Sequence, residues 1–200
     1  MLRQAGKSGS MPGRRLRGRK MRKEFAVLAA GGLALGLMAA LGSAQADKAS
    51  RPSPPAKASC ALDDKNAITV EYSSPRAKGR KIFGELVPYG QVWRAGANEA
   101  TTFVATTDVM VGGTHVSAGS YTLFVIPDKA KWTLVISKKT GEWGVPYPGA
   151  DSDLARVDMK VSAIPSAVEN FTIAFGKAPK GCPLIMEWET TRASVDITKM

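Results

Sequence analysis

Histidine is the first residue type to consider for chemistry, because acid–base and nucleophilic catalysis near neutral pH most often use an imidazole. The 200-residue chain contains one histidine, His115. It follows the Gly112-Gly113 pair of a predicted tight turn, and the chain has no G-x-S-x-G segment. We therefore predict that His115 is an exposed strand residue and that the chain has no catalytic triad, and we assign no catalytic residue in the leading interpretation.

A long segment, 79–101, holds the densest set of residues suited to ligand binding, with several charges, glycines and three aromatic side chains. Ordered loops of this length often carry function. In one interpretation Phe83, Leu86 and Trp93 anchor the loop in the core, and an Arg–Glu pair braces it. In the other, the loop binds an anionic or polyol ligand. The candidate ligand-binding residues are Arg80, Tyr89, Trp93, Arg94, Asn98 and Glu99.

A second aromatic group, Trp143 and Tyr147, lies in a stretch rich in Gly and Pro. Aromatic faces on such a loop can stack on a sugar or a peptide, so both residues join the candidate ligand site. The alternative is a hydrophobic plug that closes one end of the domain.

The first 46 residues have the pattern of a secretory signal peptide. Basic residues are dense in 14–23, an apolar run covers 25–41, and small residues precede Asp47. This order predicts cleavage after Ala46, although a start at Met21 would also give a signal of ordinary length. An uncleaved membrane anchor is the alternative. The Pro/Ser-rich stretch 47–59 is predicted to be a flexible leader, and the folded domain to occupy 60–200.

Two cysteines, Cys60 and Cys182, predict a disulfide, because an exported chain meets an oxidising compartment. Two reduced thiols are the alternative. Two cysteines and one histidine do not make a four-ligand metal site without carboxylates at suitable spacing, and we expect no metal. The acidic run 151–153 is predicted to be a solvated turn. Phosphate and dinucleotide fingerprints are absent, so no cofactor is expected.

Charge and composition restrict the class of partner. The chain carries a formal charge of +11, but nine basic residues and one acidic residue lie in 1–46, which leaves +3 for the rest. The remaining basic residues are scattered, which argues against nucleic-acid binding. The membrane is expected to be met only through the transient signal peptide. An ordinary apolar fraction of 44% excludes a collagen-like or wholly disordered chain.

Alternation of apolar and polar residues dominates the rest of the chain, and turn residues separate the segments. No apolar stripe of helical period lasts three turns, and the best helical candidate is one turn at 82–86. Short strands at this spacing predict an all-β domain, an antiparallel β-sandwich or barrel-like fold. The predicted strands are 68–72, 101–106, 109–111, 114–116, 121–126, 132–137, 154–161, 171–175, 184–188 and 194–197.

Three motifs resemble the domain of unknown function 2911 family of exported bacterial proteins. They are KGRKIFGELVPYGQVWRAGANEAT at 78–101, the segment from Val111 to Pro127, and WTLVISKKTGEWG at 132–144. The resemblance covers about 60–198 and implies a mostly β domain in a bacterial envelope, periplasmic or extracellular. It brings no established catalytic residue or cofactor.

Three interpretations of function stay open. The first is a non-enzymatic exported module that binds a small, glycan-like or protein ligand, with an envelope protein as one such partner. The second is a carboxylate-based hydrolase in which Glu99 is the base and Arg94 or Lys81 stabilises developing negative charge. The third is a purely structural envelope domain. A cleft that holds Glu99 with a second titratable group would favour the hydrolase.

Overall fold

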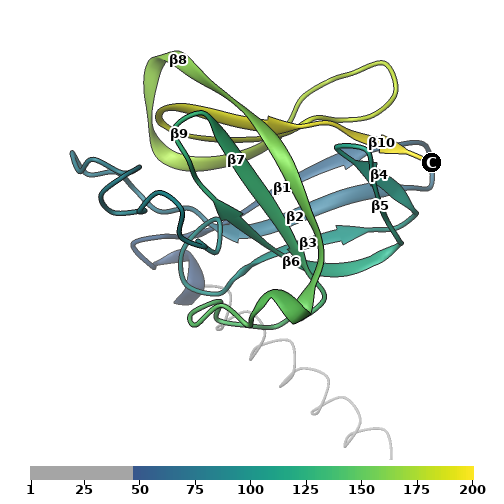
Figure 1. Ribbon diagram of the computed structural model, residues 1–200, viewed down its shortest axis with the longest axis horizontal. Coiled ribbons are helices and arrows are strands. Elements are labelled where there is room, and N and C mark those ends of the chain that lie inside the picture. Colours follow the sequence, from purple (N-terminus) through teal and green to yellow (C-terminus); the bar gives the residue numbers. More distant parts are fainter. Residues whose placement is uncertain (1–46) are drawn as a thin grey trace, which may run out of the picture. The chain divides into compact units, whose positions relative to one another are not determined.

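Seven strands form one curled antiparallel sheet in the computed structural model, which describes residues 47–200 (Figure 1). In sheet order they are β1 (Pro55–Ala61), β2 (Ala67–Ser73), β3 (Thr101–Ala105), β6 (Gly119–Ile126), β7 (Lys131–Ser137), β8 (Asp153–Phe175) and β9 (Leu184–Val195). A second sheet has the order β10 (Ile197–Lys199), β4 (Val109–Val111) and β5 (Thr114–Val116). One 3₁₀ turn, η1, covers Ala150–Ser152. The predicted antiparallel all-β fold is therefore confirmed, and its form is a curled sheet with a small second sheet.

Alternating burial along the strands explains the curl. In β2, Ile68, Val70 and Tyr72 face the interior, whereas Glu71 between them is exposed. The sheet bends around this apolar face until the second half of β8 lies beside the chain that follows β2. There the Phe171 N–H donates to the Pro75 carbonyl at 2.8 Å, and the Ile173 N–H donates to the Tyr72 hydroxyl at 3.0 Å.

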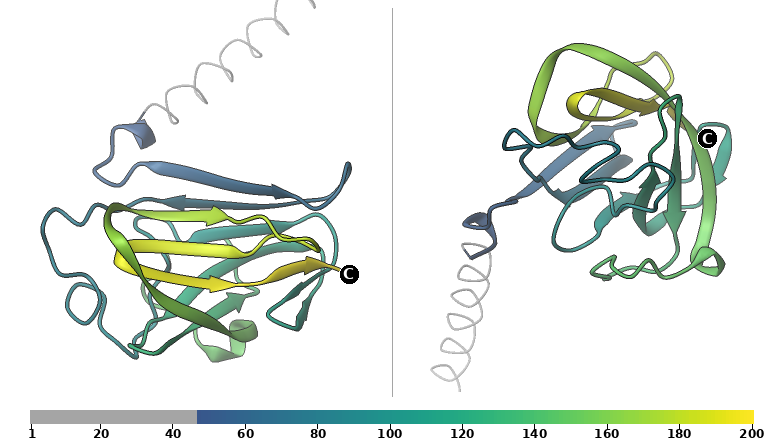
Figure 2. Two further views of the ribbon diagram at one scale, coloured as in Figure 1. Left: turned by 90° about the horizontal axis from the view of Figure 1, so that it is seen from above. Right: turned by 60° about the vertical axis from the view of Figure 1, so that its left-hand side comes forward.

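The bend is concentrated in β8, which is drawn in green and sweeps around one side of the domain in Figure 2. Its register against β9 shifts between Ala163 and Val168 and again between Val168 and Thr172. Extra residues in one strand bend it and increase its twist. The sequence predicts two separate strands here, 154–161 and 171–175. In the structure one strand spans both, and the residues between the two predicted strands are mostly exposed.

The first strand begins inside the stretch that the sequence predicts to be a flexible leader, and it ends two residues beyond it. β1 begins at Pro55 and pairs along its whole length with β2, so that Ala58 opposes Val70 and Cys60 opposes Ile68. Its inward residues are mostly alanine, which gives a weak apolar alternation. The predicted signal peptide 1–46, with Ala46 at its cleavage site, lies outside the described residues.

The predicted helical turn at 82–86 is a set of tight turns. The Val87 N–H donates to the Ile82 carbonyl at 2.9 Å, and the two strand-like residues Phe83 and Val87 form a bridge. Phe83 is buried, as expected for an anchor, but Leu86 is 46% exposed and does not enter the core. Within the part of the chain that the structure describes, no helix has the length and apolarity needed to cross a membrane.

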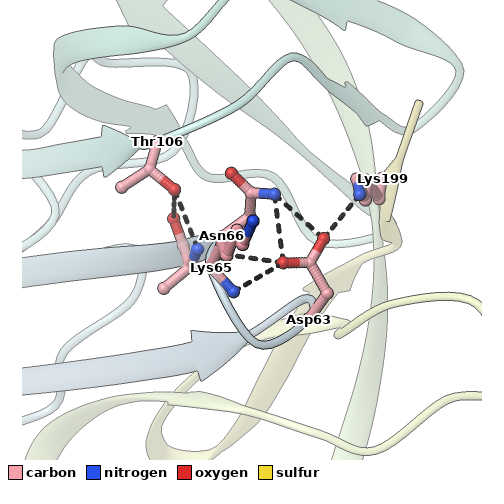
Figure 3. A network of polar contacts seen from close by, with 6 residues as sticks. Asp63, Lys65, Asn66, Thr106 and Lys199 are labelled. Atoms are coloured by element: carbon pink, nitrogen blue, oxygen red, sulfur yellow. Dashed lines mark hydrogen bonds and ion pairs between the residues drawn. The ribbon is translucent and has the colours of Figure 1, made fainter.

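A polar network ties the β1–β2 turn to the C-terminal strand (Figure 3). The Asp63 carboxylate accepts hydrogen bonds from the Asn66 side chain and from the backbone N–H groups of Lys65 and Asn66, and it pairs with Lys199 of β10. The Asn66 side chain, Lys199 and these backbone donors hold the pKa of Asp63 well below its ordinary value. At the start of β2, the Thr106 hydroxyl accepts from the Ala67 N–H at 2.9 Å.

The predicted disulfide is confirmed. Cys60 in β1 is bonded to Cys182, just before β9, with Cα atoms 6.5 Å apart and 122 residues of separation. Both residues are buried, and the bond joins two segments that are distant in sequence. A cross-link over so many residues restricts the unfolded chain strongly.

We expect the double variant Cys60→Ala/Cys182→Ala to be less stable by about 4–5 kcal/mol, the chain-entropy value for a closed loop of this size. Urea unfolding under non-reducing conditions measures the difference. Reductant should lower the stability of the unmodified chain to that of the variant and leave the variant unchanged. Equal stability of the two chains without reductant would contradict a stabilising role.

Candidate functional site

Trp93 anchors the long loop in the core. Its ring stacks on Trp188 with centroids 5.8 Å apart and an interplanar angle of 20°, and it meets the edge of Phe171 at 4.9 Å. Its backbone exchanges two hydrogen bonds of 2.8 Å with Val125 in β6. The indole N–H donates to the Gly96 carbonyl at 3.1 Å. Trp93 therefore belongs to the packing that positions the loop, and its ring does not line an open pocket.

The residue after this anchor, Arg94, meets the second predicted aromatic group. Its guanidinium carbon lies 5.9 Å from the centroid of the Trp143 ring, and Nη1 donates to the Trp143 carbonyl at 3.5 Å. The Ala100 N–H donates to the Glu142 carbonyl at 3.0 Å, which fixes the two loops together. Trp143 is 53% exposed, so one aromatic surface of this contact faces solvent.

Gly144 allows this close approach of the loops. It has φ +80°, and a Cβ at this position would lie 2.9 Å from the Ala100 Cβ and 3.0 Å from the Arg94 Cβ. Such a backbone conformation and such a distance both favour glycine. The Arg94 side chain is therefore held against the backbone of the facing loop.

The guanidinium of Arg94 has few hydrogen-bond acceptors among the described residues. Burial lowers the pKa of Arg94, and its buried Nε makes no hydrogen bond to any described residue. No carboxylate in residues 47–200 forms a salt bridge with it. The brace between Arg94 and Glu99 considered from the sequence is therefore not formed.

Glu99 instead holds the N-terminal stretch on the domain. Arg51 donates from Nη1 to both carboxylate oxygens, at 3.0 and 2.8 Å, and Lys48 lies 3.2 Å from Oε1. Partial burial would raise the pKa of Glu99, but hydrogen bonds from its own N–H, Arg51 and Lys48 lower it to about 2. Beside it, the Asn98 amide donates to the Ser53 carbonyl at 2.9 Å, with Asn98 at φ 55°. These contacts order the residues just before β1.

A cleft of about 450 Å³ lies between this N-terminal stretch and the outer surface of the first three strands. Strand register aligns Lys57, Glu71 and Thr102 in one row across its floor. We call it the leader cleft, and its lining residues are Lys48, Arg51, Pro55, Ala56, Lys57, Glu71, Tyr72, Ser73, Glu99, Ala100 and Thr102. The cleft carries three cationic and two anionic side chains, and both carboxylates are paired with cations.

Three of the predicted site residues, Arg80, Tyr89 and Tyr147, lie away from the leader cleft and from the Arg94–Trp143 contact. Arg80 donates from Nε to the Ala77 carbonyl at 2.9 Å and from Nη2 to the Arg76 carbonyl at 2.6 Å, so it caps backbone groups. Tyr89 is 37% exposed, and its ring lies over Gly84.

Tyr147 forms part of a cover over the outer face of the sheet. Its hydroxyl contacts Asp153 Oδ1 at 2.5 Å and Arg156 at 3.3 Å, and its ring meets the edge of Phe124 at 5.2 Å. Phe124 is fully buried on this face. This placement agrees with a plug at this end of the sheet, although Trp143 on the same loop stays exposed.

The structure therefore gathers the predicted residues into two groups, Arg94 with Trp143 and Asn98 with Glu99. Sequence reasoning missed the partners of the second group, Lys48 and Arg51, because the proline-rich stretch predicts a flexible leader. Lys48 and Arg51 are basic residues close to the predicted domain boundary, and this could have suggested that they pair with an acidic residue of the domain. No group of three or more potential metal ligands gathers among residues 47–200, and Asp153 of the acidic run pairs with Arg156.

Comparison with known proteins gives a family. A family described as "Protein of unknown function (DUF2911)" matches residues 53–197. The chain belongs to this family. The DUF2911 match begins just before β1 and ends at the first residue of β10, so it includes both residue groups. No curated protein and no solved structure matched the chain.

We expect Gly144→Ala to destabilise this DUF2911 domain by about 1–3 kcal/mol, because the substitution adds a strained backbone and a short contact with Ala100 and Arg94. Gly141→Ala is the matched control, since Gly141 has φ +73° and open space around it. Urea unfolding should show a larger loss for the variant at 144. Equal losses would mean that the close approach of the loops contributes nothing.

Protonation of Glu99 should weaken the domain in acid. Its pKa of about 2 lies below its ordinary value of 4.5, so its contribution is complete above pH 4.5 and is lost as the pH falls through about 2. Because the side chain is 40% exposed, solvent screening limits the loss to about 1 kcal/mol. The free energy of unfolding of Glu99→Gln should vary less between pH 4.5 and 2 than that of the unmodified chain. Glu85→Gln, which removes an exposed pair with Lys81, is the control and should not flatten the profile.

Proposed function

We propose that this DUF2911 domain is an exported, non-enzymatic binding module that takes a small, polar, glycan-like ligand in the leader cleft. The observation that carries the proposal is the cleft itself, about 450 Å³ in volume and lined mainly by charged and hydroxyl-bearing side chains. Binding sites for small ligands have volumes of about 300–1,000 Å³.

The lining suits a ligand rich in hydroxyl groups. Lys57 and Glu71 form an exposed pair at 3.0 Å, and Thr102 lies opposite Glu71 on the neighbouring strand. A sugar hydroxyl both donates and accepts, so it can bridge an amine and a carboxylate that already neutralise each other. A charged ligand would have to displace one partner of such a pair.

The state of the carboxylates argues against the hydrolase interpretation. The leader cleft does bring Glu71 and Glu99 together, as a two-carboxylate enzyme requires. However, a general base or acid works best with a pKa near the operating pH. With a pKa of about 2 and two cationic partners, Glu99 binds protons too weakly for that role. Paired carboxylates are better suited to hydrogen bonding with a bound ligand.

Export is part of the same proposal. It is supported by the signal-peptide pattern of residues 1–46, with cleavage between Ala46 and Asp47, and by the Cys60–Cys182 bond, since disulfides persist in oxidising compartments. We place the domain in the periplasm or outside the cell. The bound partner there is a small molecule or the glycan of another envelope component.

Filling the leader cleft tests the binding proposal. We expect Thr102→Trp to occupy the cleft and to weaken binding at least tenfold, measured by titration calorimetry against neutral disaccharides and short envelope glycans. Thr69→Trp is the matched control, because Thr69 lies two residues before Glu71 on β2 and outside the cleft. It should bind as the unmodified chain does.

Two results would count against the proposal. One is the absence of binding by every saccharide, and the other is equal affinity of the variants at 102 and 69. Release of cleaved sugar during the titration would favour the hydrolase instead.

A further inference from the structure

Arg94 differs from the other arginines among residues 47–200 in how little the protein uses its donors. Arg51, Arg76, Arg80, Arg156 and Arg192 each make at least two polar contacts no longer than 3.3 Å, to carboxylates, carbonyls or hydroxyls. Arg94 makes one, at 3.5 Å, to the Trp143 carbonyl. A guanidinium carries five N–H donors, so most of those of Arg94 remain unused.

The fold nevertheless holds Arg94 in a fixed place. Trp93 before it is packed in the aromatic core, and Gly144 lies against its aliphatic chain. Burial opposes its charge, and its buried Nε has no hydrogen-bond partner among residues 47–200. A buried donor without an acceptor destabilises the fold. A ligand would meet the terminal nitrogens instead. Their one hydrogen bond to the described residues is the long contact with the Trp143 carbonyl, so an anion there would accept from donors that the protein leaves unused.

The neighbour of this guanidinium points to the rest of the ligand. Trp143 is 53% exposed, whereas Trp132 and Trp188 are 1% exposed in the core. An exposed indole in contact with a cation offers a flat apolar surface beside a positive charge. A sugar or other ring that carries a negative group would meet both features at once.

We propose that Arg94 and Trp143 form a site for a ring-bearing carboxylate of the uronic acid class. The two carboxylate oxygens accept from the terminal nitrogens of Arg94 in the planar fork that arginine favours, and the ring lies against the Trp143 indole. No bond is made or broken. The site is separate from the leader cleft, and it needs no ligand there.

A matched pair of sugars tests the site. The probes are D-glucuronate and D-glucose, which differ in one carboxylate, added to ¹⁵N-labelled protein at equal concentration and ionic strength. We expect glucuronate to shift the Arg94 Nε–H and Trp143 indole N–H signals in NMR spectra. Glucose should shift neither. Equal shifts with both sugars would overturn the requirement for a carboxylate.

Variants separate the roles of the two side chains. Arg94→Lys keeps the charge but not the fork, and should weaken glucuronate binding about tenfold. Arg192→Lys is the control at a partly exposed pair with Glu187 and should bind normally. Trp143→Ala changes an exposed side chain, so the protein should fold, and glucuronate should then bind no better than acetate. Unchanged affinity in Arg94→Lys or Trp143→Ala would overturn the site.

Two further probes define the class of ligand and the independence of the site. If inorganic phosphate or acetate shifted both signals as strongly as glucuronate, the site would be a general anion site, and the ring-bearing class would be wrong. Thr102→Trp should leave glucuronate binding at Arg94 intact, since it fills only the leader cleft. Loss of both binding events in that variant would mean one continuous site and would overturn the separation proposed here.

Discussion

The stacking of Trp93 on Trp188 is the contact on which the position of the long loop depends. It draws the middle of a long loop onto β9 and β8, with Phe171 completing the cluster. Aromatic side chains bury large areas, so three of them give the loop an anchor of several kcal/mol without regular secondary structure. Arg94, Asn98 and Glu99 take their positions from this anchor, because they follow it within a few residues.

Charge around the leader cleft is arranged in pairs. Exposed ion pairs of this kind each contribute little to the stability of the fold. Their main effect here is to position neighbouring segments of the chain. Arg51 and Glu99 fix where the N-terminal stretch meets the loop, and Lys57 and Glu71 fix the polar floor. Arg94 is the exception to this arrangement. The cations of the leader cleft are paired, whereas Arg94 beside Trp143 has no carboxylate partner among the described residues. The two surfaces therefore differ in their chemistry.

Much of the sheet could be predicted from sequence, because burial on one face imposes alternation that is visible locally. The Gly112-Gly113 turn and the strands that flank it are in this category. The run from Tyr121 to Ile126 was predictable for another reason, since it is almost continuously apolar and both faces of its central residues are buried. β1 was hidden because its inward residues are small. The full length of β8 was hidden because its middle is exposed, and only its pairing with β9 keeps it extended.

The candidate site was predictable by residue type and not by geometry. Trp93 and Arg94 are neighbours in sequence, yet one belongs to the core and the other to the surface. The meeting of Arg94 with Trp143 and of Glu99 with Arg51 joins residues about fifty positions apart. Such meetings depend on strand register and loop packing, which composition and periodicity do not encode.

The Cys60–Cys182 bond has a consequence for how the chain comes apart. It encloses β2 through β8, the long loop and the Trp143 loop within one covalent ring. A single cut by a protease anywhere in that ring opens it but leaves both fragments joined through the cystine. Only β9 and β10, beyond Cys182, and the stretch before Cys60 lie outside the ring. A domain nicked at its exposed loops would thus keep its pieces tethered until a reductant reached the bond.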